Sequence, residues 1–430
     1  MPDWLPGALE YLPRWIEFQM RLFEQPGCVI AVAHQGHLVL ETALGCANLR
    51  TGERLTPRHR FRVGSHSKTF TAAGVMKLRE RGTVGLDDRI GQHVPGLHPT
   101  LAETRLTQLL SHTSGLVRDG TTGDQWFDRR PFADVDELSA AFAGIPTIEA
   151  NTRFKYSNYG YGLLGRLIES VTGEPYAVWI QREIVDAAAL TETTPDMPVP
   201  NGVPMASGHS GKLPLGHRIV LPGHQTTNAL APATGFVSTA GDLARFFARL
   251  VPSSPVALLT VASRREMTRA QWRNPHSTLE RHYGLGTMSG GARDWWWFGH
   301  AGAFQGFLSQ TAALPAHDIT IAIVTNAIDG YAYQVAGWRA PRPRDLREAW
   351  RRHRGGARLG RPLVEHLERH RSGAHGREGA GREPGVADAL HRCQRDHGLR
   401  AGPSDNRGRQ RLRQSRRDSR ADTWRGRRGV

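Results

Sequence analysis

Strand patterns lie at both ends of the first 337 residues, and a long stretch with mostly helical signals separates them. CVIAVAH (28–34) and HLVLETALG (37–45) predict two strands that turn at Gln35-Gly36 as an antiparallel hairpin. Strand patterns return after about residue 280, in YGLGTMS, WWWFGHAG, GFLSQTAALP and ITIAIVTNA. A chain that leaves a sheet layer and later returns to it predicts an α+β body.

Amphipathic helices are predicted where apolar residues recur every three or four positions. Gly82 and Gly173 follow two of these segments and are typical helix stops. The predicted helices cover 9–23, 65–81, 160–173 and 239–251. The mostly helical stretch of about 90–235 is therefore predicted as a subdomain of a single body, 1–337.

Composition places this body among globular proteins with a sizeable core. Hydrophobic residues make up 39% of the 430 residues. No apolar run approaches the ~20 residues of a membrane span, so we expect none. The N-terminus, MPDWLPGALEYLPRW, lacks a basic start followed by an apolar stretch. This predicts the absence of a signal peptide and a cytoplasmic location.

The net charge of +16 belongs almost entirely to the last part of the chain. Residues 338–430 hold 26 arginines, no lysine and 11 acidic residues, whereas the body is nearly neutral. This segment has few large aliphatic residues and no sustained period, which predicts a disordered tail. One alternative is a changed reading frame, and another is nucleic-acid binding through salt-dependent phosphate contacts. The body itself carries no charge signal for nucleic acid.

Several common sites are not indicated by the sequence. Three cysteines are too few for a disulfide scaffold and lack zinc-ligand spacing. The chain has no H-E-x-x-H, no P-loop and no G-x-G-x-x-G placed after a strand, so we expect neither metal nor nucleotide cofactor. It also lacks the G-x-S-x-G of α/β-hydrolases.

The first motif with chemical meaning is Ser65-His66-Ser67-Lys68, at the predicted start of a helix. Residues three apart share a helix face, so Lys68 can reach the hydroxyl of Ser65. The N-terminal end of the helix dipole favours a developing negative charge at Ser65. A desolvated lysine can act as a base, which arginine cannot, and only four of the 56 basic residues are lysines. The alternative is a helix cap followed by a solvent-facing lysine.

The second motif is Tyr156-Ser157-Asn158, just before the helix over 160–173. A buried tyrosine near cations can have its pKa lowered from ~10 and then pass protons. Asn158 offers a donor and an acceptor, so it can orient a lysine or a substrate amide. The alternative is a loop with an asparagine cap.

The third motif is His300-Ala301-Gly302, in a predicted strand. Small residues on a strand let a substrate backbone approach closely. The alternative is a glycine-rich strand with one solvated histidine.

The three motifs occur in an order that resembles the serine β-lactamase and penicillin-binding-protein superfamily, particularly its class C-like branch. The resemblance covers most of residues 8–335. It is carried by FRVGSHSKTFTAAGVMKLRERGTVGLDD, LTQLLSHTSGL (106–116), FKYSNYGYGLLGRLIESVTGEPY and GHAGAFQGFLSQTAALP. It implies a β-lactamase/transpeptidase-like fold: an antiparallel sheet flanked by helices, with a mostly helical subdomain.

The resemblance also implies roles for individual residues. Ser65 would be the acylated nucleophile, and Lys68 and Tyr156 would share general-base and general-acid duty. Asn158 would orient Lys68 and the substrate. The backbone amides of Ser65 and Ala303 would form the oxyanion hole.

His300 and Gly302 would form the third motif, where β-lactamases carry Lys-Thr-Gly. That lysine helps to hold the drug's carboxylate, and histidine is a weaker, pH-dependent cation. The resemblance therefore implies a serine hydrolase that cleaves a small ester, amide or peptide through a Ser65 acyl-enzyme, as an esterase or a D-aminopeptidase/carboxypeptidase-like enzyme. The alternatives are a β-lactamase and an inactive relative that only binds peptides or peptidoglycan fragments.

Two further features lie close to these motifs. In the run Trp295-Trp296-Trp297-Phe298, alternate side chains face opposite sides of a strand. One pair is expected in the core, and the other could line the cleft. His112, in SHTSG, is expected to be a structural hydrogen-bonding residue rather than a catalyst.

Overall fold

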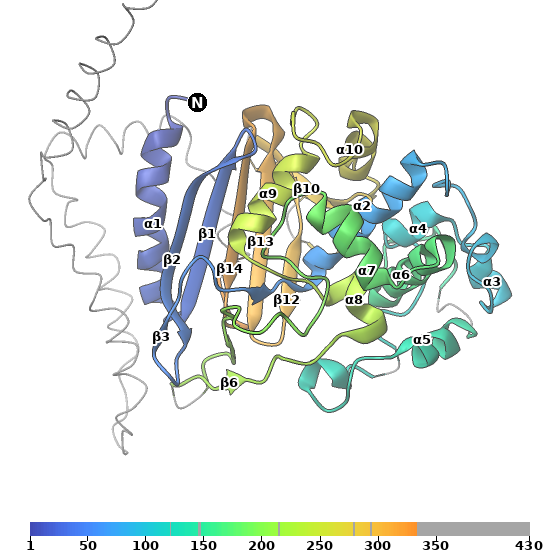
Figure 1. The fold of residues 1–430 in the computed structure, drawn as a ribbon, viewed down its shortest axis with the longest axis horizontal. Coiled ribbons are helices and arrows are strands. Elements are labelled where there is room, and N and C mark those ends of the chain that lie inside the picture. The colour runs from blue at the N-terminus through green and yellow to red at the C-terminus, as the bar shows by residue number, and fades with distance from the viewer. Residues whose placement is uncertain (121, 145–147, 214–215, 278–279, 293–294, 333–430) are drawn as a thin grey trace, which may run out of the picture. The chain divides into compact units, whose positions relative to one another are not determined.

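One antiparallel sheet holds ten of the strands in the described part of the chain (Figure 1). The structure is a computed structural model that describes residues 1–332 except 121, 145–147, 214–215, 278–279 and 293–294. The sheet order is β3-β2-β1-β14-β13-β11-β10-β9-β8, and β12 pairs with β13. The bounds are β1 Gly27–His34, β2 His37–Asn48, β3 Glu53–Arg54, β8 Trp272–Arg273, β9 Arg281–Tyr283, β10 Met288–Ala292, β11 Trp295–Gly299, β12 Ala301–Phe304, β13 Phe307–Leu314 and β14 Ile319–Thr325. The sheet thus joins the first strands of the body to its last.

The central strand β1 is buried along its whole length, which shows that both faces of the sheet are covered. It pairs with β2 on one side and with β14 on the other. Its odd-numbered residues, such as Val29, belong to one hydrophobic cluster, and even-numbered residues such as Ile30 belong to another. This period of two places alternate side chains on opposite faces.

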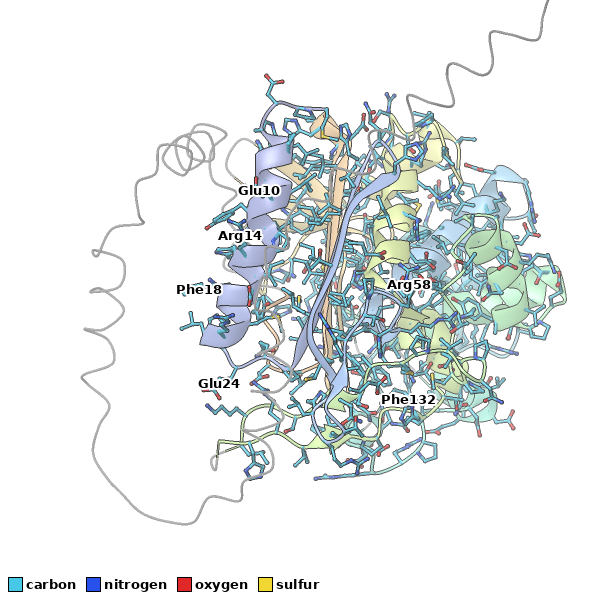
Figure 2. The ribbon with its side chains drawn as sticks, turned by 60° about the vertical axis from the view of Figure 1, so that its left-hand side comes forward. Glu10, Arg14, Phe18, Glu24, Arg58 and Phe132 are labelled. Atoms are coloured by element: carbon cyan, nitrogen blue, oxygen red, sulfur yellow. The ribbon has the colours of Figure 1, made fainter. Side chains whose placement is uncertain are left out.

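Helices cover the two faces of the sheet. On one face lies α1 (Leu5–Leu22), whose buried residues Ile16 and Met20 join the cluster of Ile30. The outward side of α1 carries Glu10, Arg14 and Phe18 (Figure 2). On the other face α9 (Ala240–Leu250) packs against β1 and β14. The sheet is therefore the middle layer, with α1 on one face and α9 on the other. The remaining helical segments lie on the same side of the sheet as α9 (Figure 1).

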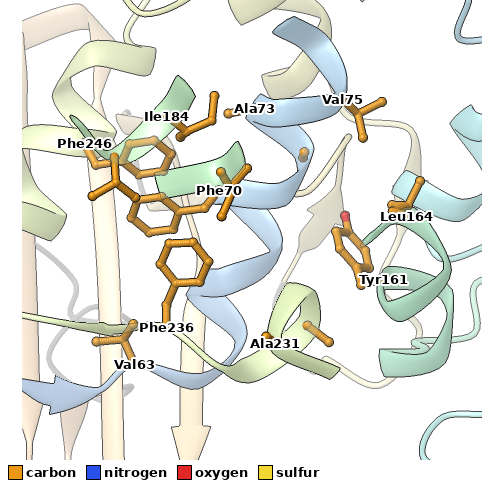
Figure 3. Packing of buried hydrophobic residues seen from close by; sticks show 14 of the residues in the cluster. Val63, Phe70, Ala73, Val75, Tyr161, Leu164, Ile184, Ala231, Phe236 and Phe246 are labelled. Atoms are coloured by element: carbon orange, nitrogen blue, oxygen red, sulfur yellow. The ribbon is translucent and has the colours of Figure 1, made fainter. Parts of the chain in front are cut away.

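The helix α2 (Ser67–Glu80) is surrounded by other elements and is buried over most of its length. Phe70 stacks between Phe236 and Phe246, with ring centroids 4.3 and 3.8 Å away (Figure 3). Aromatic stacking of this kind adds to the burial of apolar area. The helix is thus held in one position from several sides.

The remaining helices come mainly from the middle of the chain. Most of them lie beyond α2 as seen from the sheet (Figure 1). Their bounds are α3 Pro99–Ala102, α4 Leu106–Leu110, α5 Val135–Phe142, α6 Asn158–Thr172, α7 Tyr176–Ile180, α8 Ala231–Thr234 and α10 Val261–Thr268. Short strand pairs join β4 (Phe61–Arg62) to β7 (Val237–Ser238) and β5 (Gly208–His209) to β6 (Val220–Leu221).

The structure confirms the predicted hairpin, the four amphipathic helices and the strands predicted in GFLSQTAALP and ITIAIVTNA. Two other predicted strands are corrected: most of YGLGTMS forms the connection between β9 and β10, and WWWFGHAG is divided at His300 into β11 and the start of β12. Gln35 and Gly36 both have positive φ, as the tight hairpin turn predicted there requires. Gly173 ends α6 in the left-handed conformation that favours glycine. Within the described residues, no helix has the length and apolar character needed to cross a membrane. The predicted tail, 338–430, lies outside the described residues, and the domain boundaries stay predictions.

The tryptophan run in β11 packs mostly into the protein. Trp297 is buried in the cluster of α1, and Trp295 packs against Trp4 and His317. This confirms that one pair lies in the core. The other pair is split, because Phe298 is buried in the opposite cluster while Trp296 is 45% exposed. Cleft lining therefore stays a prediction for Trp296 alone.

Candidate active site

Ser65 is the accessible residue in a buried segment. It lies in the 3-10 turn η1 (Gly64–His66), between β4 and α2. Every other residue from His59 to Met76 is buried. The predicted helix over 65–81 is thus a turn followed by α2, and the turn presents the Ser65 side chain just before the helix begins. The other hydroxyl side chains of this segment are buried, so Ser65 carries the one that a substrate can reach.

Lys68 is fully buried and contacts three oxygen atoms. Its Nζ lies 3.2 Å from Oγ of Ser65, 2.6 Å from Oδ1 of Asn158 and 2.8 Å from the carbonyl oxygen of Ala233. The structure therefore brings together the first two predicted motifs. It rules out the solvent-facing lysine that the motif alone left open.

Burial lowers the pKa of Lys68 well below its ordinary value of 10.5. The desolvation of the amine is the largest cause, because burial disfavours the charged form. The negative charge of Asp119 opposes this and raises the pKa, while the positive charge of Arg118 lowers it further. The environment of Lys68 thus favours the neutral amine more than water does.

The ring of Tyr156 lies close to both a lysine and a histidine. The Nζ of Lys68 is 4.7 Å from the ring centroid, and the ring of His112 is 4.0 Å away on centroids. His112 also accepts a hydrogen bond on Nδ1 from the amide of Ser157. This hydrogen bond supports the structural role expected for His112, because it holds the loop that carries Tyr156.

Asn158 is the first residue of α6 and links Lys68 to a carboxylate. Its Oδ1 accepts from Lys68, and its Nδ2 donates to Oδ1 of Asp119. Because a carboxylate can only accept, Nδ2 must face Asp119 and Oδ1 must face Lys68. Neither Asp119 nor the carbonyl of Ala233 was expected from the sequence. Asp119 lies four residues beyond the SHTSG segment, which was the only nearby signal.

His300 differs from the weak cation that the sequence suggested. It is fully buried, and burial lowers its pKa well below 6.5, with His66 and Lys68 adding to the effect. Its Nδ1 lies 2.7 Å from the carbonyl of Ala301, and its Nε2 lies 2.9 Å from the hydroxyl of Tyr283. A carbonyl can only accept, so Nδ1 carries a proton. The lowered pKa favours the neutral ring, in which Nε2 accepts from Tyr283, over the pH-dependent cation that the resemblance suggested.

Thr311 of β13 ties the turn of Ser65 to the third motif. Its hydroxyl accepts from the amide of His300 at 3.0 Å and lies 3.2 Å from Nε2 of His66. His66 is fully buried, and desolvation lowers its pKa to about 4. The hydroxyl thus joins the imidazole of His66 to the backbone of His300. The contact had no signal in the sequence.

Two glycines allow β12 to lie directly against the turn that carries Ser65. A Cβ added to Gly302 would lie 2.0 Å from the carbonyl oxygen of Val63. Gly64 has a φ of +52°, and its added Cβ would lie 2.4 Å from the carbonyl oxygen of Ala303. Both distances are far inside van der Waals contact with backbone atoms. Gly302 therefore lets the backbone of β12 pack closely against the backbone at Val63.

We expect Gly302→Ala to destabilise the protein by about 1–3 kcal/mol or more, because overpacked backbone contacts cannot relax easily. The melting temperature in calorimetry measures the effect. Gly291→Ala is the matched control, since Gly291 lies on the same sheet and has no atom within 4 Å of an added Cβ. Equal melting temperatures for both variants would contradict the close approach.

In the part of the chain that the structure describes, no three His, Cys, Asp or Glu side chains gather as a metal site requires. The site is instead built from a serine, a buried lysine, a tyrosine and an asparagine, next to a strand. The family model for Beta-lactamase matches residues 19–342. The chain belongs to the Beta-lactamase family.

The relatives of this Beta-lactamase family chain include penicillin-binding proteins. Penicillin-binding protein 4 of Amycolatopsis lactamdurans is 29% identical over 317 residues, which cover 70% of this chain and 81% of that protein. Protein flp of Staphylococcus aureus (strain COL) is 26% identical over 187 residues, or 42% of this chain. The aligned part spans only 36% of the length of Protein flp.

A solved structure shows the same fold. The D-stereospecific amidohydrolase from Streptomyces sp. superposes with a TM-score of 0.61 at 24% identity, covering 74% of this chain and 96% of that one. The β-lactamase/transpeptidase-like fold predicted from the motifs is thus confirmed. Proteins of the Beta-lactamase family are generally serine hydrolases.

Proposed function

We propose that this protein is a serine hydrolase that cleaves an ester or amide through an acyl-enzyme on Ser65. The observation that carries the proposal is the set of three oxygen atoms around the buried amine of Lys68. Two of these atoms, on Asn158 and Ala233, can only accept hydrogen bonds. The third is the hydroxyl of Ser65, which can either accept or donate.

This arrangement suits a neutral lysine that acts as a base. A neutral amine has two hydrogens and one lone pair, and the two obligate acceptors take both hydrogens. The lone pair is then left for the hydroxyl hydrogen of Ser65. The pKa of Lys68, lowered by burial, supports this neutral state. Lys68 can therefore accept the proton as Ser65 attacks.

Tyr156 is the second proton carrier in the proposal. Its ring lies against the amine of Lys68, and Arg118 lies 5.5 Å from the same ring. The contact with Lys68 places the phenol close enough to the amine to exchange protons with it once that amine has taken the proton of Ser65. Tyr156 would pass the proton from Lys68 to the leaving group.

The oxyanion would bind between two backbone amides. In the β12–β13 hairpin, Phe304 and Phe307 form the pair nearest the turn, and Ala303 and Leu308 form the adjacent pair. Because the hydrogen bonds of an antiparallel ladder alternate, the amide of Ala303 points away from β13. Ala303 lies against Gly64, beside the amide of Ser65. These two donors fit the negative oxygen that develops when a carbonyl is attacked.

The reaction then runs in two balanced steps. Oγ of Ser65 bonds to the carbonyl carbon as its proton moves to Lys68, and the alcohol or amine leaves with that proton. Water next attacks the acyl carbon, the bond to Ser65 breaks, and Ser65 regains a proton. The net change is hydrolysis to an acid and an alcohol or amine.

The burial of His300 bears on the substrate class. An imidazole that is fully buried, has a lowered pKa and forms hydrogen bonds within the protein through both nitrogens is poorly placed to offer a positive charge to a substrate carboxylate. This favours esters and amides without that carboxylate over β-lactams. The fold shared with a D-stereospecific amidohydrolase adds D-amino-acid amides as candidates.

The test is to trap the acyl-enzyme. Purified protein is mixed with an activated short-chain aryl ester, quenched within seconds and weighed intact, and its peptides are then mapped. We expect one acyl group per chain, on the peptide that contains Ser65. Hydrolysis with the acyl group on another residue would place the nucleophile elsewhere. An inert protein would instead support the inactive, peptide-binding relative.

A further inference from the structure

We infer that Asp119 is a positioning residue, which orients the Asn158 amide toward Lys68 and, together with Arg118, sets the pH at which the Lys68 amine gives up its proton. This inference rests on the proposed base role of Lys68. Asp119 is not part of any of the three motifs, and it touches Lys68 only through Asn158.

The relay from Asp119 to Lys68 has one possible orientation. The carboxylate accepts from Nδ2 of Asn158, and Oδ1 of the same amide accepts from Lys68. If the amide were flipped, an oxygen would face a carboxylate and an NH₂ group would face the lysine. The first contact would be repulsive, and the second would leave a hydrogen of the Lys68 amine without the acceptor that Oδ1 provides. The carboxylate therefore selects the amide orientation that supplies Lys68 with an acceptor.

The backbone holds Asp119 firmly at the start of α6. The carbonyl of Arg118 accepts from the amide of Asn158 at 2.9 Å, and Ser157 Oγ donates to the carbonyl of Val117. Gly120 follows with a φ of +85°, and its added Cβ would lie 2.5 Å from the hydroxyl of Tyr159. The segment 117–120 is thus fastened to the N-terminal end of α6, where an anionic side chain is favoured.

The groups that face Lys68 come from several elements. They are Asp119 and Arg118 of the 117–120 segment, Tyr156 and Tyr161 with their rings 4.7 and 5.6 Å from Nζ, and the neutral His112 and His300. Asp119 and Arg118 act on the amine with opposite signs. They also form an ion pair with each other, in which Arg118 is 68% exposed.

Because the charges of Asp119 and Arg118 act on Lys68 with opposite signs, removing each of them should shift the pKa of Lys68 in opposite directions. A nearby carboxylate stabilises the protonated amine, so removing its charge lowers the pKa of Lys68. Acylation requires the neutral amine, so the acylation rate falls at acidic pH, where the amine is protonated. We call this fall the acid limb of the pH–rate profile, and a lower pKa of Lys68 would move it to lower pH. Removing the positive charge of Arg118 has the reverse effect and moves the limb to higher pH.

The experiment measures the rate at which a fluorophosphonate probe modifies the full chain, as a function of pH. The variants are Asp119→Asn, Asp119→Ala and Arg118→Gln. Asparagine keeps an oxygen that can accept from Asn158 but removes the charge, whereas alanine removes both. Melting curves accompany each variant, because a purely structural role would change stability without moving the pH profile.

For Asp119→Asn we expect an acid limb about one pH unit lower, with a plateau rate close to that of wild type. For Arg118→Gln we expect a limb about half a unit higher, since this charge is exposed and screened. Asp119→Ala should lower the plateau rate about tenfold, because the amide of Asn158 loses its partner. If Asp119→Asn keeps the plateau rate that Asp119→Ala loses, the plateau depends on the orientation of the Asn158 amide and the position of the limb depends on the charge of Asp119.

A limb that stays in place in Asp119→Asn, or that moves to higher pH, overturns the inference, and so do equal shifts in Asp119→Asn and Arg118→Gln. Either result in an enzyme that still labels on Ser65 leaves the proposed function standing. A wild-type chain that the probe does not modify overturns the proposed function and this inference together.

Discussion

Ser65→Ala is expected to remove labelling by a fluorophosphonate probe and to lower kcat/KM for ester hydrolysis on the order of 10⁴-fold or more. The reason is that the hydroxyl of Ser65 forms the covalent bond, and no other residue from His59 to Met76 is accessible. Intact mass before and after the probe measures the loss. Melting should change little, because Ser65 is partly exposed and substitutions at such positions usually alter stability by about 0.5 kcal/mol or less.

Ser67→Ala is the matched control for this variant. Ser67 lies two residues further along, but it is buried. Its Oγ donates to the carbonyl of Gly64 at 2.6 Å and accepts from the amide of Phe236 at 3.0 Å. Removing it takes away the hydroxyl that the buried amide of Phe236 donates to, at a cost of about 1–3 kcal/mol, while the carbonyl of Gly64 still accepts from the amide of Ser67. The control should melt lower but still take one probe molecule. Equal labelling of Ser65→Ala and wild type would place the nucleophile elsewhere.

Lys68→Met is expected to slow probe labelling and hydrolysis about 10²- to 10⁴-fold, the usual range for loss of a general base. Methionine keeps a long side chain of similar reach but has no amine to accept the proton of Ser65. Lys68→Arg should be equally impaired, because a guanidinium stays protonated. Labelling rates under single-turnover conditions report the effect on acylation directly.

The pH profile gives a second measurement on the same variant. Only the neutral amine can act, so wild type should lose activity as the pH falls through the lowered pKa of Lys68. Lys68→Met should lack that limb. The control is Lys77→Met, on the same helix near its C-terminal end, which should keep both the rate and the limb. A normal labelling rate in Lys68→Met would remove the lysine from the mechanism.

The local elements were predictable because their patterns are local. The two strands at 28–34 and 37–45, the turn between them at Gln35-Gly36 and the helix stop at Gly173 were predicted from the sequence, and the structure has all of them. The order of the three motifs also predicted the fold, which the family match and the solved relative confirm. The strands, the turn, the helix stop and each single motif depend on residue types within a few positions of each other.

The charge state of the site was not predictable in this way. His300 was expected to be a weak, pH-dependent cation, yet it is fully buried, and the desolvation of its ring lowers its pKa well below 6.5. Gly302 was expected to admit a substrate backbone, and the structure shows it in contact with Val63. Both features depend on what lies across the sheet from the motif.

The sequence by itself determined which side chains are available for chemistry: a serine, a lysine three residues on, a tyrosine and an asparagine. Only the tertiary structure decided how they are partnered. Lys68 finds the amide oxygen of Asn158 across 90 positions of chain and the carbonyl of Ala233 across 165. The physical reason is that the pKa of a buried amine depends on burial from every side and on charges brought close by folding, which no local pattern contains.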